Sequence, residues 1–368
     1  MKRTAITKAL ALLLAATLCV LSFAACGKAD AGTKTTDPAA GTEEEAKTPV
    51  LTPESTKIAL LLCSAEMKSA SARAAWLVLE KFSKETGIQV KWWMLPTSDD
   101  LKENLDDIIA QGYNIIITNN GLHTEYIKER SPDLVDVTFV AMEGFFTPKG
   151  ENEALANLPN LIQGTVRAEE SAFIAGYLLA KRTENGKIGM LNGTKNPPGF
   201  QMEAGFRAGV AYAEQELGKT IETRIEYVGN GFDRTGGKNT ANLLYNSGCD
   251  LIYICAGGET DWGALEAAKA QQKPCITAGH TSYIAPESVV AEVLKSKDPV
   301  LTAVLNGLYY GTMERGQVLD HGLNDGSTGL AKTALTDAFF GDALLKELEA
   351  VTAQIQSGAI QVPQDLNP

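Results

Sequence analysis

The sequence predicts an α/β protein of two lobes, each a doubly wound parallel sheet flanked by helices. Short apolar runs alternate with stretches of helical periodicity from Lys57 onward, as in consecutive βα units. The alternation starts again at Lys187, and a further strand–helix–strand addition follows the second series. Such an addition returns the chain to the first lobe and then crosses back. We therefore expect a hinged clamp with a ligand cleft between the carboxyl ends of facing strands.

The amino terminus predicts an export signal over residues 1–25. Basic residues precede an apolar run at 9–25, and the small residues Ala24 and Ala25 come directly before Cys26. This ending resembles that of a bacterial lipoprotein signal, which implies that Cys26 becomes the diacylated first residue. A plain secretory signal and a short transmembrane anchor are the alternatives.

Residues 26–56 predict a lipid-anchored, disordered linker. The stretch contains no aromatic residue and is rich in Ala, Thr, Glu, Gly and Pro, so it cannot bury enough apolar surface to fold. A spacer of this kind suits an extracytoplasmic domain anchored to the outer face of the cell membrane. We expect the folded body to begin near Lys57.

The composition excludes several classes of function. A net charge of −12 over 368 residues disfavours nucleic acid and anionic membrane surfaces as partners, so contact with the membrane is expected through the lipid only. With three histidines and no CxxC spacing, we expect no metal site and no cofactor. Four cysteines of the folded body lie in or beside apolar runs. Buried free thiols are expected there, although export also permits a disulfide among Cys63, Cys249, Cys255 and Cys275.

The first βα series runs to about residue 165. Its apolar runs have the length of buried parallel strands, and Gly87 and Gly112 end two of its helices. The predicted strands are 57–62, 88–95, 115–118, 138–142 and 161–165, and the predicted helices are 72–85, 101–111 and 125–130.

The second series is organised around residues 186–217. There a short apolar run ends in the loop sequence NGTKNPPG, and Met202, Phe206 and Val210 then follow at helical spacing. The predicted strands of this series are 187–191, 223–228, 250–255 and 274–278, and the predicted helices are 169–181, 202–217, 238–246 and 262–270.

The carboxyl-terminal third predicts the return to the first lobe. A strand at 288–293, a helix at 298–315, a short strand near Gln317 and the segment 322–330 are expected, followed by a helix at 344–356. The predicted lobes are 57–165 plus 284–318 and 166–283 plus 319–335. Residues 336–368 form an extension that either braces one lobe or reaches a partner.

Several motifs in this order resemble the basic-membrane-protein family of solute-binding lipoproteins, the purine-nucleoside receptors of ABC importers. They are EESAFIAGY at 169–177, KIGM at 187–190 with MEAGFRAG at 202–209, AGG at 256–258 and EVLK at 292–295. The resemblance spans residues 57–332 and implies a type I periplasmic-binding-protein fold, an ABC permease as partner and a nucleoside-like solute.

Three departures from the family pattern concern the ligand. The family's Asp/Ser/Phe/Asn loop after the first strand corresponds to residues 64–72, where Ser64 and Ser69 are candidate contacts but no Asp, Phe or Asn is present. Its second aspartate motif falls on His280, and its helix-start aromatic falls on Met202, whereas Lys295 matches. An imidazole does not accept two ribose hydroxyls as a carboxylate does. The resemblance therefore implies the fold and the transport role more strongly than the ligand.

Aromatic and amide side chains are the first candidate contacts. Phe200 and Trp262 stand at predicted loop–helix starts, where their rings would sandwich a planar ligand. Asn119 and Asn120 follow a predicted strand, where amides would bond a base edge. Packing beneath a loop for the rings, and turn formation for the asparagines, are the alternatives.

Charged groups complete the candidate site. Glu259 and Asp261 follow the Gly258 turn, and either would replace the missing ribose carboxylate. His280 ends a predicted strand and Lys295 lies near a hinge strand. A solvated loop acid, a structural histidine and a surface lysine are the respective alternatives.

These observations favour a solute-binding protein over an enzyme. The chain has no Gly-x-Ser-x-Gly elbow, and Gly229-Asn230-Gly231 lacks the third glycine of a dinucleotide fingerprint. We expect a small solute, a nucleoside or related heterocycle, to be bound by lobe closure. A sensor or adhesin of the same fold that binds a sugar or free base without transport is the alternative.

Overall fold

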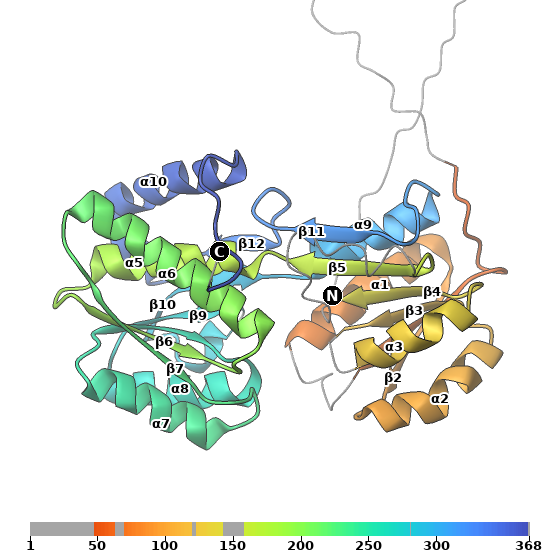
Figure 1. The fold of residues 1–368 in the computed structure, drawn as a ribbon, viewed down its shortest axis with the longest axis horizontal. Helices are drawn as coiled ribbons and strands as arrows, with labels where there is room; N and C mark the ends of the chain where they lie inside the picture. The colour runs from red at the N-terminus through yellow and green to blue at the C-terminus, as the bar shows by residue number, and fades with distance from the viewer. Residues whose placement is uncertain (1–47, 63–69, 120–122, 143–157, 280, 367–368) are drawn as a thin grey trace, which may run out of the picture. The chain divides into compact units, whose positions relative to one another are not determined.

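The described residues belong to one compact unit, Lys47–Pro368. The structure, a computed structural model, describes residues 48–62, 70–119, 123–142, 158–279 and 281–366. They form two six-stranded sheets with helices on both faces of each (Figure 1). The predicted α/β fold of two lobes is confirmed.

The first sheet is parallel throughout, in the order β11-β5-β4-β3-β1-β2. Most of its strands are buried on both faces, which explains their continuous apolar sequences. Its strands are β1 (Lys57–Leu62), β2 (Gln89–Met94), β3 (Ile115–Thr118), β4 (Thr138–Met142), β5 (Leu161–Val166) and β11 (Val318–His321).

Helices cover both faces of this sheet. One core joins the sheet to α1 (Ala70–Thr86) and α9 (Asp298–Tyr309). The other joins it to α2 (Ser98–Ala110) and α3 (Thr124–Arg130), which leads into the 3-10 turn η3 (Ser131–Asp133).

The second sheet has the order β12-β10-β9-β8-β6-β7, parallel except for the antiparallel pair β10–β12. This repeats the strand order of the first sheet, as expected for two successive βα series. Its strands are β6 (Lys187–Asn192), β7 (Glu222–Tyr227), β8 (Leu251–Cys255), β9 (Cys275–Ala278), β10 (Val289–Lys295) and β12 (Thr328–Ala331).

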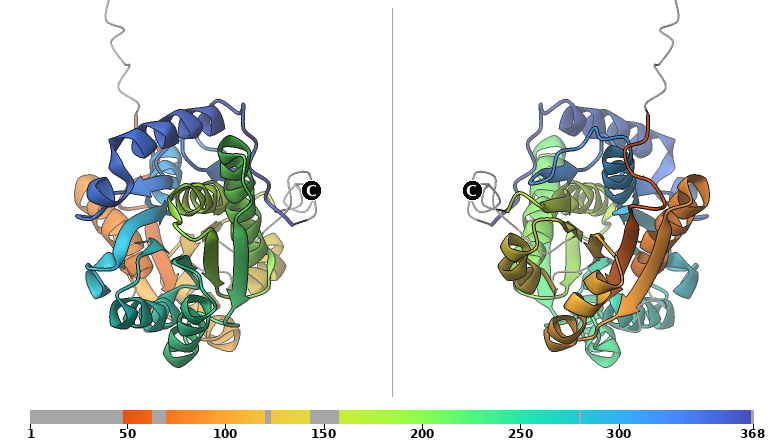
Figure 2. Two further views of the ribbon diagram at one scale, coloured as in Figure 1. Left: turned by 90° about the vertical axis from the view of Figure 1, so that its left-hand side faces the viewer. Right: turned by 90° about the vertical axis from the view of Figure 1, so that its right-hand side faces the viewer.

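Two groups of helices cover the second sheet. On one face, α5 (Ala168–Arg182), α6 (Pro197–Leu217) and α10 (Thr336–Gln356) share a core with the strands. On the other, α7 (Arg234–Asn246) and α8 (Gly258–Gln271) do so, and the turn η4 (Ser282–Ile284) lies beside α8. Figure 2 (left) shows the dark blue α10 and the teal α7 and α8 on opposite sides of the sheet.

Helices α5 and α6 approach so closely that glycine is required between them. A Cβ atom on Gly205 or Gly209 would lie 2.1 Å from the carbonyl oxygen of Glu169 or Phe173, respectively. On α5, a Cβ on Gly176 would lie 2.2 Å from the carbonyl oxygen of Phe206. Since real Cβ atoms do not come so near, these glycines set the distance between the two helices.

The described chain crosses between the two sheets at three places. Arg167 joins β5 to α5, residues 296–297 join β10 to α9, and residues 322–327 join β11 to β12. The sheet pairing differs from the predicted partition, which placed 284–318 in the first lobe and 319–335 in the second. Strand β10 belongs to the second sheet because it pairs with β9, and β11 belongs to the first because it pairs with β5.

Several element boundaries differ from the prediction for local reasons. Helices α6, α7 and α8 begin four or five residues earlier than expected. The proline at the first position of α6 and the glycines in the first turns of α7 and α8 are compatible with a helix start. Helix α9 ends at Tyr309, since Gly311 adopts a left-handed conformation, φ +62°.

The end of the predicted linker belongs to the folded body. The Val50 amide donates to the Tyr309 carbonyl at 2.8 Å, Leu51 packs against the core of the first lobe, and Thr56 is buried. Residues 50 and 51 therefore brace the end of α9.

Cys249, Cys255 and Cys275 are buried free thiols, as expected for cysteines in core strands, and Cys63 lies outside the described residues. Among the described helices, none is both long enough and apolar enough to cross a membrane.

The contact between α5 and α6 yields a first prediction. Gly209→Ala should lower the free energy of unfolding by about 2 kcal/mol, because overpacking outweighs the gain of about 1 kcal/mol in helix propensity. Urea denaturation measures the change. Ala211→Gly, at an exposed position of α6, is the propensity control and should cost about 1 kcal/mol. A Gly209→Ala variant as stable as the parent would contradict the packing argument.

Candidate functional site

The loop between β6 and α6 is held in one conformation by two asparagines. The Asn192 side chain donates to the Gly199 carbonyl at 2.8 Å and accepts from the Gly193 amide at 2.8 Å. The Asn196 side chain caps α6 by accepting from the Gly199 amide at 3.1 Å, directly before Pro197. The first turn of α6 is thereby fixed at the carboxyl edge of the second sheet.

Phe200, in that first turn, is partly exposed and pairs with an aromatic ring from β7. Its ring centroid lies 6.4 Å from that of Tyr227 in a T-shaped contact, and the Lys195 ammonium lies 5.5 Å from the Tyr227 centroid. The Tyr227 hydroxyl donates to Glu203 at 2.6 Å, and burial together with this carboxylate raises the pKa of Tyr227. Met202, two residues on, is buried in the core.

The start of α8 supplies the other candidates of the second lobe. Gly257 and Gly258 have positive φ, and a Cβ on Gly258 would lie 2.5 Å from the Gly231 carbonyl oxygen. The Thr260 hydroxyl donates to the Asn230 carbonyl at 2.9 Å, which ties α8 to the loop after β7. Trp262 is partly buried, with the Arg234 guanidinium 5.9 Å from its ring centroid.

Asp261 is a buried carboxylate at this edge, only 2 % exposed. Burial raises the pKa of Asp261 to about 7, and hydrogen bonds from the backbone amides of Gly257 and Ala256 oppose that rise. Its Oδ1 has no hydrogen-bond partner among the residues that the structure describes. A buried acid of this kind is a candidate for binding hydroxyl or amino groups of a ligand.

In the first lobe, Asn119 stands at the carboxyl end of β3 and is buried. Its carbonyl oxygen accepts from the Lys297 ammonium at 2.7 Å. The predicted Lys295 ends β10, opposite Thr328 in the antiparallel pair, and is partly buried. The contact of Lys297 with Asn119 joins residues 178 apart in sequence, so no local signal could have revealed it.

A buried carboxylate that sequence reasoning missed joins two crossings of the chain. Glu170 pairs with Arg167 at 2.8 Å and accepts from the Leu323 amide at 2.7 Å and the Thr328 hydroxyl at 2.8 Å. Gly322 lies close beside it, and a Cβ there would lie 2.3 Å from Glu170 Oε2 and would have to displace this side chain.

Further hydrogen bonds tie the third crossing, residues 296–297, to this network and the first two crossings to each other. The Arg167 amide donates to the His321 carbonyl at 2.8 Å, and the Ser296 amide donates to the Ser327 carbonyl at 2.7 Å. The Ser171 hydroxyl donates to the Leu294 carbonyl. All three crossings therefore meet near the first turn of α5.

Glu169, the other acid of that turn, was also missed as a polar group of structural importance. It is 2 % exposed and accepts from the amides of Gln201 on α6 and Gln364 near the carboxyl terminus. Burial, opposed in part by the bond from Gln364, raises the pKa of Glu169 to about 7. The sequence EESAF indicated a family motif but not that both of its acids would be buried.

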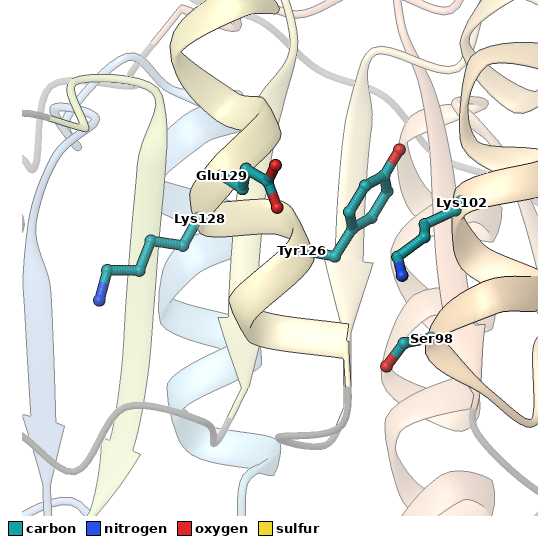
Figure 3. Close-up of a pocket in the computed structure, with 5 residues that line it drawn as sticks. All are labelled: Ser98, Lys102, Tyr126, Lys128 and Glu129. Atoms are coloured by element: carbon teal, nitrogen blue, oxygen red, sulfur yellow. The ribbon is translucent and has the colours of Figure 1, made fainter.

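Two surface hollows lie apart from these groups. One, between α2 and α3, is lined by Ser98, Lys102, Tyr126, Lys128 and Glu129, and Figure 3 shows Tyr126 and Lys102 directed toward each other while Lys128 points away. The other lies beside α10 near Phe339. None of the described residues that the sequence predicted to bind ligand lines either hollow.

The remaining predicted residues, Ser64, Ser69, Asn120, His280 and Cys26, lie outside the described residues. Within the part that is described, no group of three or more His, Cys, Asp or Glu side chains is arranged to hold a metal ion.

Comparison with known proteins identifies the family. A family model for PnrA-like ABC transporter substrate-binding proteins (Bmp) matches residues 56–365. Basic membrane protein D of Borreliella burgdorferi is 28% identical over 246 residues, which cover 66% of this chain and 69% of that protein. Basic membrane protein A2 of Borrelia garinii is 32% identical over 215 residues, which cover 55% of this chain and 59% of that protein, less than two thirds of it.

Solved structures show the same fold. A solute-binding protein of an ABC transporter system from Aeropyrum pernix has a TM-score of 0.71 at 19% identity, covering 85% of this chain and 95% of that one. A protein of the same description from Conexibacter woesei has a TM-score of 0.66 at 18% identity, covering 84% of this chain and 99% of that one.

The buried acids predict an unusual dependence of stability on pH. Because the pKa of Asp261 is about 7 in the folded chain and near 4 when unfolded, the folded state holds an extra proton between these values. The stability that protonated Asp261 contributes is therefore fully present below pH 4 and is lost as the pH rises through 7. The raised pKa of Glu169 changes the stability in the same direction. Asp261→Asn should flatten the fall in unfolding free energy between pH 5 and pH 8 by about 2 kcal/mol.

Urea denaturation at the two pH values measures this slope. Asp342→Asn, at an exposed position of α10, controls for the loss of one negative charge. A parent protein that becomes more stable from pH 5 to pH 8 would contradict the assignment of these buried acids.

Proposed function

The chain belongs to the PnrA-like family of ABC transporter substrate-binding proteins, and from this premise we propose that it binds a purine nucleoside or related heterocycle by lobe closure and delivers it to an ABC permease. Substrate-binding proteins of this family are extracytoplasmic. The signal sequence supports anchoring of this chain to the outer face of the cell membrane through lipid on Cys26. The relatives are solute-binding proteins, which supports a binding role without catalysis.

One observation carries the proposed ligand class: the partly exposed Phe200 in the capped first turn of α6, beside Tyr227. Aromatic rings at a helix start on the carboxyl edge of a parallel sheet suit the face of a planar heterocycle. We assign Phe200 and Trp262 to contacts with the ring system. Asn119 and Asn120 on the first lobe are assigned to its polar edge.

A carboxylate is a strong acceptor for the hydroxyl groups of a nucleoside. Asp261 is the buried carboxylate next to the Gly257-Gly258 turn, and its Oδ1 accepts no hydrogen bond from the described residues. We assign it the role of accepting from ligand hydroxyls, in place of the aspartates that the family pattern expects at the loop of Ser64 and Ser69 and at His280. Lys295 matches the family pattern and is proposed as the basic residue that contacts the ligand.

Binding of an unmodified nucleoside should raise the thermal midpoint of the purified full chain. A ligand that binds only the folded state adds about 2.7 kcal/mol of stability when its free concentration is a hundred times Kd. Inosine, guanosine and adenosine should shift the midpoint, and free bases and sugars are screened beside them. A shift with bases or sugars alone would assign the second function considered above, a binder of a different ligand. The absence of any shift would contradict a heterocycle-binding role.

The stacking assignment is tested with the ligand found in this screen. Phe200→Ala should weaken binding about 10- to 100-fold, corresponding to the loss of about 1–3 kcal/mol of ring burial and stacking. Isothermal calorimetry measures Kd. Tyr310→Ala, at the far end of α9, removes an exposed aromatic outside the assigned site and should leave Kd unchanged. Equal affinities of Phe200→Ala and the parent would remove Phe200 from the site.

A further inference from the structure

The residues after α10 return to the crossings of the chain. The Ile360 amide donates to the Gln354 carbonyl at 3.1 Å, which turns the chain back past the end of the helix. Ile360 and Val362 then pack against the core that α5, α6 and α10 share with the second sheet. In Figure 1 the dark blue segment after α10 runs back down in front of α6. The last residues are thus a packed segment of the second lobe.

The first attachment of this segment is to the crossing at 322–327. The Gln356 side-chain amide donates to the Leu323 carbonyl at 3.1 Å, and the Asn324 side chain donates back to the Gln356 carbonyl at 3.3 Å. The amide of Leu323 is held at the same time by the buried carboxylate of Glu170. The end of α10 therefore holds the crossing from one side and α5 holds it from the other.

The second attachment is to the first turn of α5. The Gln364 side chain donates to Glu169 Oε1 at 2.9 Å, and Gln201 of α6 binds the other carboxylate oxygen. A buried carboxylate depends strongly on its donors, and hydrogen bonds to charged groups contribute about 1.5–3 kcal/mol each. Gln364 is thus bound to the residue directly before Glu170.

From these two attachments we propose that residues 356–366, from the last residue of α10 onward, form a strap that holds the crossing at 322–327 against α5 and sets how readily the lobes move about their hinge. The strap acts next to all three crossings, because Arg167, Ser171 and Leu323 belong to one hydrogen-bonded network. Its role does not depend on which solute the protein binds. A substrate-binding protein needs a hinge that opens and closes, and the stiffness of a hinge is set by such contacts.

Hydrogen exchange of the purified full chain without ligand tests the strap. Gln364→Ala removes one attachment and should speed amide exchange about tenfold over residues 322–329 and 167–171, as expected from the loss of a bond to a buried carboxylate. Gln361→Ala is the matched control, because Gln361 lies in the same segment with an exposed side chain. Exchange in the control should match that of the parent.

A second variant, a deletion of residues 358–368, removes Ile360, Val362 and Gln364 together. It should speed exchange at the same two stretches by more than Gln364→Ala does, while the strands of the first sheet keep the protection of the parent. Faster exchange confined to the tail in both variants would overturn the proposal. Faster exchange spread evenly over both sheets would overturn it as well, since it would show a general loss of stability.

Discussion

Three chain crossings meet at the first turn of α5, where the buried carboxylate of Glu170 binds Arg167, the Leu323 amide and the Thr328 hydroxyl. A buried charge is costly unless it is paired and hydrogen-bonded, so these partners are needed wherever Glu170 is buried. The same partners lie on segments that pass between the two sheets. A single carboxylate thus ties two of the three connections that define a two-lobed clamp, and Gly322 leaves room for it.

The close packing of α5 against α6 also positions part of the candidate site. Glycines at the contact bring the two backbones together, and the capped start of α6 then presents Phe200 at the carboxyl edge of the second sheet. A second glycine-mediated contact exists between α7 and α8, where a Cβ on Gly263 would lie 1.8 Å from the Arg234 carbonyl oxygen. Both helix starts that carry candidate aromatics are therefore positioned by rigid helix pairs, which favours a preformed half-site on this lobe.

Family membership and ligand chemistry depend on different residues of this chain. The fold and the family follow from glycine-spaced helices and strand order, which many ligands can share. The ligand depends on a few polar side chains, and here the positions that carry aspartates in the family pattern hold other residues. Asp261, which we propose as the replacement, is a carboxylate whose burial, like that of Glu169, leaves it with a pKa near neutrality.

The sequence by itself determined the α/β class, the two βα series and most strands, because continuous apolar runs and helical periodicity are local properties. It also indicated the family through motifs such as EESAFIAGY. Only the tertiary structure decided that β10 pairs in the second sheet, that Met202 lies in the core, and that Lys297 reaches Asn119. It also decided the contacts of Glu170 and Gln364. These depend on strand pairing and on contacts between residues far apart in the chain, for which no local pattern exists.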